Sequence, residues 1–392
     1  MGSNSSSSIQ LGKRKITISR ELAEGGFGKV FLVQDDSGQY FALKQMFCQS
    51  TEQETDAHDE LNALQRFSGQ PHIIQLIDHS STSKRNSSSA SSGLTSFFTG
   101  STNEPKSNIL REVCFLFPLY ESGTAWDAIA RALANDSKPW PYNERKILFI
   151  ILGIAKALKV IHTSGFSHRD IKPHNILIED PSNSLMHKFG KDYIHPVLMD
   201  FGSINKARME IRNRKDSLAA EDEAAIKTSA AFRPPELTQV PAQISIDERV
   251  DIWGLGCTMY CLAFGWSPFE SAAEGIKRLA ILNGRFSFPD MYVLTSNGSK
   301  NVKNRDCNFS PSFCDMITDM LQVSHNNRPY AEDVVARCEK LLSISSPAQS
   351  SSTSNSSQSN TSSNNSNPTK FKFPEQTFDR KEIDRALDRG YR

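Results

Sequence analysis

The chain has 392 residues, enough for about two domains of ordinary size. Lysine and arginine number 45 and aspartate and glutamate 44, so the net charge of +1 argues against binding to nucleic acid. No apolar run approaches the ~20 residues of a membrane-spanning helix, and seven cysteines without a CxxC pair favour reduced thiols in the cytosol.

The N-terminal part of the chain has the pattern of a small β-sheet. Residues 1–15 are rich in serine, and we expect them to be disordered. Short β-type runs and glycine-containing turns follow, which predict an antiparallel meander. A helix is expected at about Glu52 to Phe67, and strands at Ile73–Ile77 and Val113–Phe117. Residues 16–119 therefore form the predicted N-lobe.

A helical pattern dominates after Trp126. Before it, residues 80–108 consist mainly of Ser, Thr, Asn and Gly and predict a disordered insert between two strands. The most apolar stretches are Asn143–His162 and Val250–Phe264, both of helical length. Residues 120–343 therefore form the predicted C-lobe, which is larger and mainly helical.

The whole pattern predicts an α+β protein of two lobes, folded over residues 16–343. A Ser/Asn-rich linker at 344–370, expected to be disordered, and a charged tail at 371–392 follow this domain. A cleft between two such lobes is a natural ligand site.

Three glycines, Gly25, Gly26 and Gly28, lie between the first two predicted strands. Glycine at such a turn lets backbone N–H groups approach a phosphate, although a plain hairpin turn uses glycine as well. Lys44 ends the next apolar strand, where it either stays exposed or pairs with an anion. Glu60 on the predicted helix is the candidate partner, and the pair would direct the ammonium group to the phosphates of ATP.

The segment His168–Leu177 places a carboxylate, an ammonium group and an amide in one short loop. Asp170 is suited to orient a hydroxyl group and accept its proton. Lys172 is suited to neutralise a phosphoryl group during transfer, and Asn175 to bind a metal ion. Asp200 follows a short apolar run and suits chelation of a Mg²⁺ ion that bridges ATP phosphates. The order and spacing of these groups favour phosphoryl transfer.

These segments resemble those of the eukaryotic protein kinases, over roughly Ile16 to Leu342. Arg233–Glu236 resembles the A-P-E motif of that family, and Asp251–Gly254 the helix whose aspartate braces the catalytic loop. The resemblance implies ATP and Mg²⁺ as cofactors, proteins as substrates, a monomer, and a structural ion pair between Glu236 and Arg328. One departure is Ala23, which stands where the kinase loop G-x-G-x-x-G has its first glycine.

The resemblance also implies which residues contact the nucleotide and the metal. Phe117 is expected at the back of the adenine pocket, just before the hinge Pro118–Tyr120. The expected metal ligands are Asn175 and Asp200. The full set of expected ATP-binding residues is Leu22, Gly25, Gly26, Gly28, Val30, Ala42, Lys44, Glu60, Phe117, Leu119 and Leu177.

Lys172 and Ser229 indicate serine and threonine as acceptors, since tyrosine kinases of the family typically carry Ala or Arg at the first position and Pro at the second. Dual specificity stays open. A pseudokinase acting as a scaffold would lack at least one of four functional residues, and all four are present: Lys44, Asp170, Asn175 and Asp200.

Within the superfamily the chain is most similar to the numb-associated kinases, on three segments: Gly25–Phe27, Leu116–Tyr120 and Asp200–Asn205. The best match is their branch of small lipid-anchored Golgi and vacuolar kinases, with Glu221–Ala225 helical in the activation segment. Arg169, before Asp170, is often the mark of activation by phosphorylation, for which the candidates are Ser217, Thr228 and Ser229. The acidic residues of the predicted helix at 216–227 would supply negative charge to Arg169 without phosphate, which favours constitutive activity.

The first six residues fit the N-myristoylation pattern, with Gly2 as the acceptor. Related lipid-anchored kinases add a palmitoylated cysteine, but the first cysteine here is Cys48, inside the predicted N-lobe. The basic cluster Lys13–Lys15 is the nearest substitute. We expect a cytoplasmic protein attached weakly and reversibly to the cytosolic face of Golgi or vacuolar membranes. An unmodified serine-rich terminus is the alternative.

Overall fold

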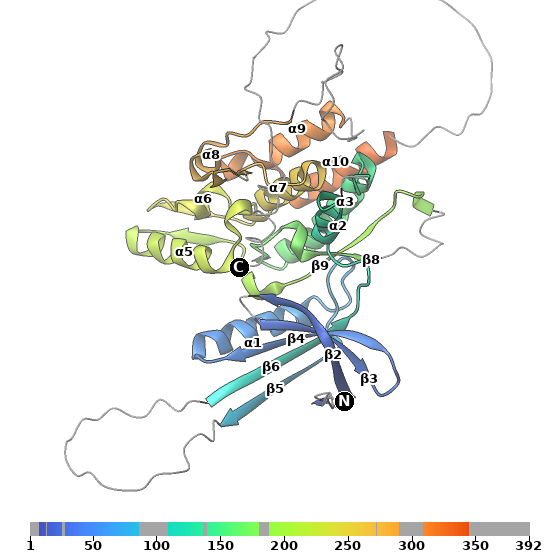
Figure 1. Cartoon of the computed structure of the whole chain (residues 1–392). Helices are drawn as coiled ribbons and strands as arrows, with labels where there is room; N and C mark the ends of the chain where they lie inside the picture. Colours follow the sequence, from blue (N-terminus) through green and yellow to red (C-terminus); the bar gives the residue numbers. More distant parts are fainter. Residues whose placement is uncertain are drawn as a thin grey trace, which may run out of the picture.

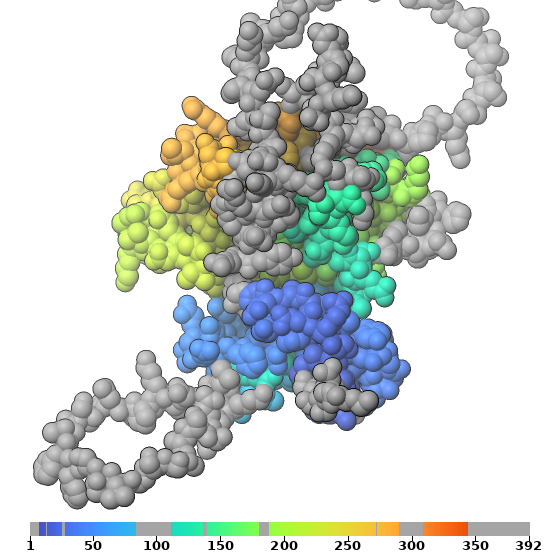
Figure 2. Space-filling view, in the orientation of Figure 1, coloured from blue at the N-terminus to red at the C-terminus, as the bar shows by residue number. Residues whose placement is uncertain are grey.

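The computed structural model describes residues 8–12, 14–25, 28–85, 109–135, 139–179, 188–271, 273–289 and 309–344. Within these ranges the chain forms an N-lobe built on one sheet and a larger, mainly helical C-lobe (Figure 1). The space-filling view shows the mainly blue N-lobe directly against the larger, green-to-orange C-lobe (Figure 2). This two-lobed α+β arrangement is the one predicted from the sequence.

The N-lobe is a six-stranded antiparallel sheet in the order β1-β2-β3-β4-β6-β5. Its strands are β1 (Ser8–Leu11), β2 (Arg14–Gly25), β3 (Gly28–Asp35), β4 (Tyr40–Cys48), β5 (Asp78–Arg85) and β6 (Ile109–Pro118). Side chains of β6 alternate between two cores. Val113, Phe115 and Phe117 pack on the side of helix α1 (Thr51–Arg66), and Cys114 and Leu116 join a small core on the opposite face.

Residues 1–15 were expected to be disordered, and the first strand of the sheet corrects this for Ser8–Leu11, while residues 1–7 and 13 lie outside the described residues. β1 pairs with the start of β2, where Ile9 lies opposite Ile16. This pairing buries Leu11 completely in the small core. The strand could not be predicted from this serine-rich composition, because it buries only one large apolar side chain completely, that of Leu11.

The strand expected at Ile73–Ile77 lies further along the chain, at β5, and takes up the first residues of the expected insert at 80–108. β5 is a polar edge strand, so its side chains carry no apolar signal. Ile73 and Ile74 are buried for another reason. They contact strand β9 (His195–Leu198) of the C-lobe, and the Ile74 N–H donates to the Leu198 oxygen at 2.9 Å. Residues 86–108, residues 345–370 of the linker and the charged tail lie outside the described residues.

Helix α7 (Val250–Phe264) forms the centre of the C-lobe, and every one of its residues is buried. Both long helices were predicted within one residue of their observed ends, the other being α3 (Glu144–Thr163). The remaining helices surround them: α2 (Ala125–Leu133), α5 (Arg214–Lys227), α6 (Pro235–Thr238), α8 (Arg278–Asn283), α9 (Pro311–Met320) and α10 (Ala331–Ile344). None of the helices in the described ranges is long and apolar enough to cross a membrane.

Short elements at the junction of the lobes carry the residues of the predicted site. They are β7 (Phe166–Ser167), η1 (Pro173–Asn175), β8 (Ile176–Glu179), η2 (Phe201–Ser203) and β10 (Asn205–Lys206). β8 pairs with β9, and β10 pairs with β7, so two small ribbons frame the loops between them. Phe201 is fully buried and packs against Phe67 of the N-lobe, with ring centroids 5.9 Å apart.

Candidate active site

The loop between β7 and β8 is fixed by a buried carboxylate at the start of α7. Asp251 accepts hydrogen bonds from the backbone N–H groups of His168 at 2.8 Å and Arg169 at 2.6 Å, and its other contact is His162 Nε2 at 2.9 Å. Burial acts to raise the pKa of Asp251, but these hydrogen bonds hold it below its ordinary value. Arg169 adopts a φ of +68°, which non-glycine residues rarely do, so the bonds to Asp251 secure a strained turn. His162 was not predicted from the sequence, because it lies 89 positions from Asp251 and only the fold brings the two together.

Two predicted catalytic residues, Lys172 and Asn175, and also Ser229, meet around the carboxylate of Asp170. Lys172 Nζ lies 2.7 Å from Asp170 Oδ2 and 2.7 Å from Ser229 Oγ. The Ser229 N–H donates to Asp170 Oδ1 at 3.0 Å. Asn175 Nδ2 donates to Oδ2 of the same carboxylate at 3.0 Å and to the Asp170 carbonyl at 2.9 Å. Asp170 is therefore held in one orientation by contacts from three sides. Only 7% of the residue is exposed.

Lys44 connects the two lobes. Its Nζ lies 2.6 Å from Glu60 Oε1 on α1 and 3.1 Å from Asp200 Oδ1 beside η2, so the contact with Glu60 expected from the sequence is present. Burial acts to lower the pKa of Lys44, but the two carboxylates raise it above its ordinary value. Burial likewise opposes ionisation of Asp200, yet the charge of Lys44 lowers its pKa to about 2. At neutral pH both groups are charged.

The predicted metal ligands fit a hard divalent cation. Asp200 is an ionised carboxylate, and because Asn175 donates through Nδ2, its Oδ1 is the atom suited to a metal. Within the described residues there is no group of three His, Cys, Asp or Glu arranged to hold a metal ion. Two protein oxygens are enough for Mg²⁺, because this ion usually completes its coordination with water molecules and with phosphate oxygens of a bound nucleotide. Asp200 itself has a φ of +63°, a conformation that sharply turns the chain after β9.

The residues expected to contact adenine come from both lobes. Ala42 in β4 pairs with Phe117 in β6, and Val30 in β3 pairs with Lys44. Phe117 is buried, with 8% exposure, at the end of its strand. Leu177 in β8 forms a bridge with Thr124 and packs on the main core. Leu119 follows β6 in the connection between the lobes and is half-buried, whereas Leu22 in β2 is exposed at 37%.

Two of the three predicted phosphate-loop glycines are described, at the ends of β2 and β3. Gly28 has a φ of +136°, and a Cβ there would lie 2.2 Å from the Gln45 carbonyl oxygen, so no other residue fits. Among the described residues, no atom lies within 4 Å of the position a Cβ of Gly25 would take, so the space beside that backbone is open there. Gly26 lies outside the described residues.

Helix α5 places an acid beside Arg169, as the sequence indicated. Glu223 Oε2 lies 3.8 Å from Arg169 Nη1, and Glu223 Oε1 accepts from Asn205 Nδ2 at 2.7 Å. Two of the residues considered for phosphorylation are buried and hydrogen bonded in this arrangement. Ser217 donates to the Val240 carbonyl at 2.7 Å and Thr228 to the Ala224 carbonyl at 2.8 Å.

The ion pair expected between Glu236 and Arg328 is present and buried. Arg328 Nη1 and Nη2 donate to the two carboxylate oxygens of Glu236 at 2.7 and 2.8 Å. Their side chains are 0% and 4% exposed. The pair joins α6, at the end of the segment that carries Ser229, to the loop before α10.

A lysine paired with a helix carboxylate in one lobe, facing an Asp-Lys-Asn cluster and a second aspartate in the other, defines a phosphotransferase of the protein kinase class. Residues 16–338 match the family model of the protein kinase domain, and the chain belongs to this family. It is 30% identical over 383 residues to a probable serine/threonine-protein kinase of Dictyostelium discoideum, covering 84% of this chain and 94% of that protein. Serine/threonine-protein kinase 16 of Mus musculus is 28% identical over 323 residues, covering 82% and 88%. Serine/threonine-protein kinase ppk13 of Schizosaccharomyces pombe is 27% identical over 374 residues, covering 84% and 92%.

Proposed function

We propose that this chain transfers the γ-phosphoryl group of ATP to serine and threonine hydroxyls of proteins. The observation that carries the proposal is the contact of Lys172 Nζ with both Asp170 and Ser229, at 2.7 Å each. The contact places a positive charge beside the carboxylate that receives the acceptor hydroxyl. The relatives named above are serine/threonine kinases by name, in agreement with this assignment.

Each residue of the cluster has a proposed role. Asp170 orients the acceptor hydroxyl and accepts its proton, and Lys172 stabilises the charge of the transferring group. Lys44, held by Glu60, positions the α- and β-phosphates. Asn175 and Asp200 would hold Mg²⁺, which when bound neutralises phosphate charge. The ionised state of Asp200 suits this role because a protonated carboxyl is a poor metal ligand.

The test is phosphate transfer from labelled Mg-ATP to casein by the purified chain, followed by analysis of the phosphorylated amino acids. We expect phosphoserine and phosphothreonine, and none with Asp170→Asn. Phosphotyrosine beside them would indicate dual specificity. A well-folded wild-type chain that transfers no phosphate would indicate a scaffold and refute the proposal.

We further propose that the chain belongs to the numb-associated branch and is constitutively active. Glu223 beside Arg169 supports this, since it provides the negative charge that a phosphorylated residue would otherwise supply. Phosphatase treatment of protein made in bacteria is expected to leave activity unchanged. Loss of activity after treatment would contradict constitutive activity. The protein is proposed to act as a monomer, which light scattering of the purified chain tests.

We also propose weak membrane attachment through acylation of Gly2, on the cytosolic face of Golgi or vacuolar membranes. The support is the N-terminal pattern and the basic residues 13–15, which would add electrostatic attraction to anionic lipid. Gly2→Ala is expected to move the membrane fraction into the cytosol, and raised salt to release part of the wild type. Identical fractionation of the Gly2→Ala and wild-type proteins would rule out the lipid anchor.

A further inference from the structure

The last residue of α5 contacts the N-lobe. Lys227 Nζ lies 2.7 Å from Asp56 Oδ1 on α1, across 171 positions of sequence. The side chains are 22% and 27% exposed, so water only partly screens the pair. In Figure 1 both helices lie on the same side of the molecule, one in each lobe. The contact therefore joins the two lobes at a second point, besides the contact of Lys44 with Asp200.

Asp56 lies one helical turn before Glu60. Residues four apart share a face of a helix, so the carboxylates of Asp56 and Glu60 project toward the same side of α1. Glu60 holds Lys44 Nζ at 2.6 Å. A rotation of α1 that separated Asp56 from Lys227 would also move Glu60 relative to Lys44.

The backbone of Lys227 is also hydrogen bonded to the segment that follows Asp200, the expected metal ligand. Its carbonyl oxygen accepts a hydrogen bond from the Ser203 hydroxyl, three residues after Asp200. Lys227 thus contacts α1 through its side chain and the segment of Asp200 through its backbone. Both partners of Lys44, Glu60 and Asp200, depend on elements that this one residue touches.

We propose that Lys227 and Asp56 are positioning residues for phosphoryl transfer. Their ion pair couples the activation-segment helix to α1, so that Glu60 keeps Lys44 in place for ATP. A partly exposed ion pair contributes little to the free energy of unfolding, so the protein without this pair should still fold. The expected effect of its loss is a shift in the orientation of α1 within the folded protein. This inference rests on the proposed kinase activity.

Charge reversal and charge exchange test the coupling. Asp56→Lys and Lys227→Asp are each expected to lower kcat/KM for ATP about tenfold, and the double variant to recover to within about threefold of wild type. Amide hydrogen exchange in α1 should rise in each single variant and fall again in the exchanged pair. Asp59→Lys on α1 and Lys215→Asp on α5 make the same charge changes at exposed positions and should change neither measurement.

The outcomes separate the coupling from the kinase activity itself. Single variants with wild-type kcat/KM, or a folded double variant that recovers neither activity nor protection of α1, would overturn the coupling while the wild type remains an active kinase. Equal losses in Asp59→Lys would also overturn it, because the effect would then come from net charge. A wild-type chain without phosphate transfer would overturn the proposed function, and the coupling with it.

Discussion

Replacing Arg328 by methionine should destabilise the C-lobe far more than the same change at Arg337, although both arginines lie beside the same pocket. Arg328 uses all five N–H groups of its guanidinium. Two bind Glu236, and three donate to the carbonyl oxygens of Gln322, Arg249 and Val323 at 2.8 to 3.1 Å. Its side chain is completely buried and lies over the ring of Trp253, with 5.0 Å to the centroid.

The size of the effect follows from what Arg328→Met leaves behind. The carboxylate of Glu236 stays buried at 4% exposure without its cation, and three backbone carbonyls lose a donor. Breaking a buried ion pair from one side costs about 3–5 kcal/mol of unfolding free energy. For a domain of this size, that loss corresponds to a fall in Tm of roughly 10 °C. Adding Glu236→Gln should return part of the loss, because the double variant no longer buries an unpaired charge.

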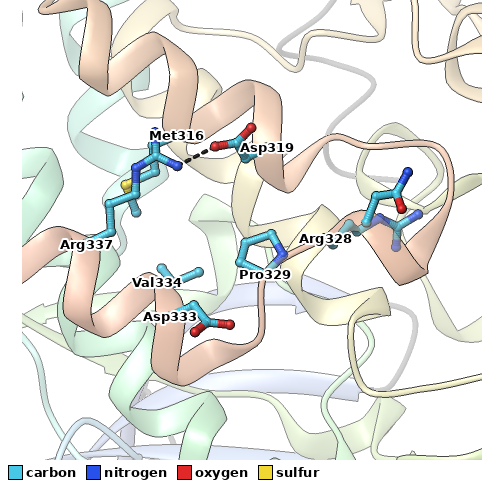
Figure 3. A pocket seen from close by; sticks show the side chains of 8 residues that line it. Met316, Asp319, Arg328, Pro329, Asp333, Val334 and Arg337 are labelled. Atoms are coloured by element: carbon cyan, nitrogen blue, oxygen red, sulfur yellow. Dashed lines mark hydrogen bonds and ion pairs between the residues drawn. The ribbon is translucent and has the colours of Figure 1, made fainter.

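Arg337→Met is the matched control. Figure 3 shows Arg337 paired with Asp319 across the pocket between α9 and α10, with Arg328 apart from this pair. The side chains of Arg337 and Asp319 are 34% and 52% exposed. Such a pair contributes about 0–1 kcal/mol, so Tm should change by no more than about 3 °C. Thermal unfolding of the three variants and the wild type is the assay, and equal shifts for Arg328→Met and Arg337→Met would refute the reasoning.

Two further predictions concern the proposed ATP site. Asp200→Asn removes the charge of a metal ligand and should lower kcat about 100-fold or more, with stability measured in parallel; near wild-type autophosphorylation would exclude the assigned role. Phe117→Gly should admit bulky adenine-site inhibitors that the wild type excludes, since this buried ring belongs to the penultimate residue of β6, next to the hinge, and equal inhibition of both proteins would contradict that placement.

The site could be predicted from the sequence where its chemistry is local. Asp170, Lys172 and Asn175 occupy one short loop, so their meeting needs no knowledge of the fold. Lys44 was expected at the end of its strand but lies in the middle of β4, which continues to Cys48. Its pairing with Glu60 on the next element, α1, was still predictable, because a lysine in an apolar strand needs an anion nearby. The long apolar helices were predictable for the same reason, because each is specified by its own side chains.

What could not be predicted depends on contacts between distant segments. Lys227 and Asp56 are ordinary charged residues on two predicted helices, and nothing in either helix indicates the other. Ile73 and Ile74 have the apolar pattern of a strand, but their burial comes from β9 in the other lobe. The polar residues of β5 are in the sheet because β6 offers backbone partners, which composition does not reveal.

A last prediction concerns pH, and it follows from a histidine inside the catalytic loop. The ring of His174 stacks on Trp126 of α2 with centroids 4.6 Å apart, and its Nδ1 is buried with no hydrogen-bond partner in the described part of the chain.

Burial, and then the charge of Lys172, lower the pKa of His174 from 6.5 to about 4. Between pH 6.5 and pH 4 the imidazole of His174 is therefore protonated in the unfolded chain but neutral in the folded chain. The folded state keeps its full stability above pH 6.5 and loses stability as the pH falls toward 4. At pH 5 the loss reaches up to about 2 kcal/mol, or roughly 4 °C in Tm.

His174→Gln keeps a neutral side chain at every pH and should remove this part of the fall in Tm between pH 7.5 and pH 5, whereas His79→Gln, at an exposed position of β5, should leave it in place. If His174→Gln and the wild type lose the same number of degrees over that range, His174 is accessible to protons in the folded protein, and the stacked, desolvated environment described for it is wrong.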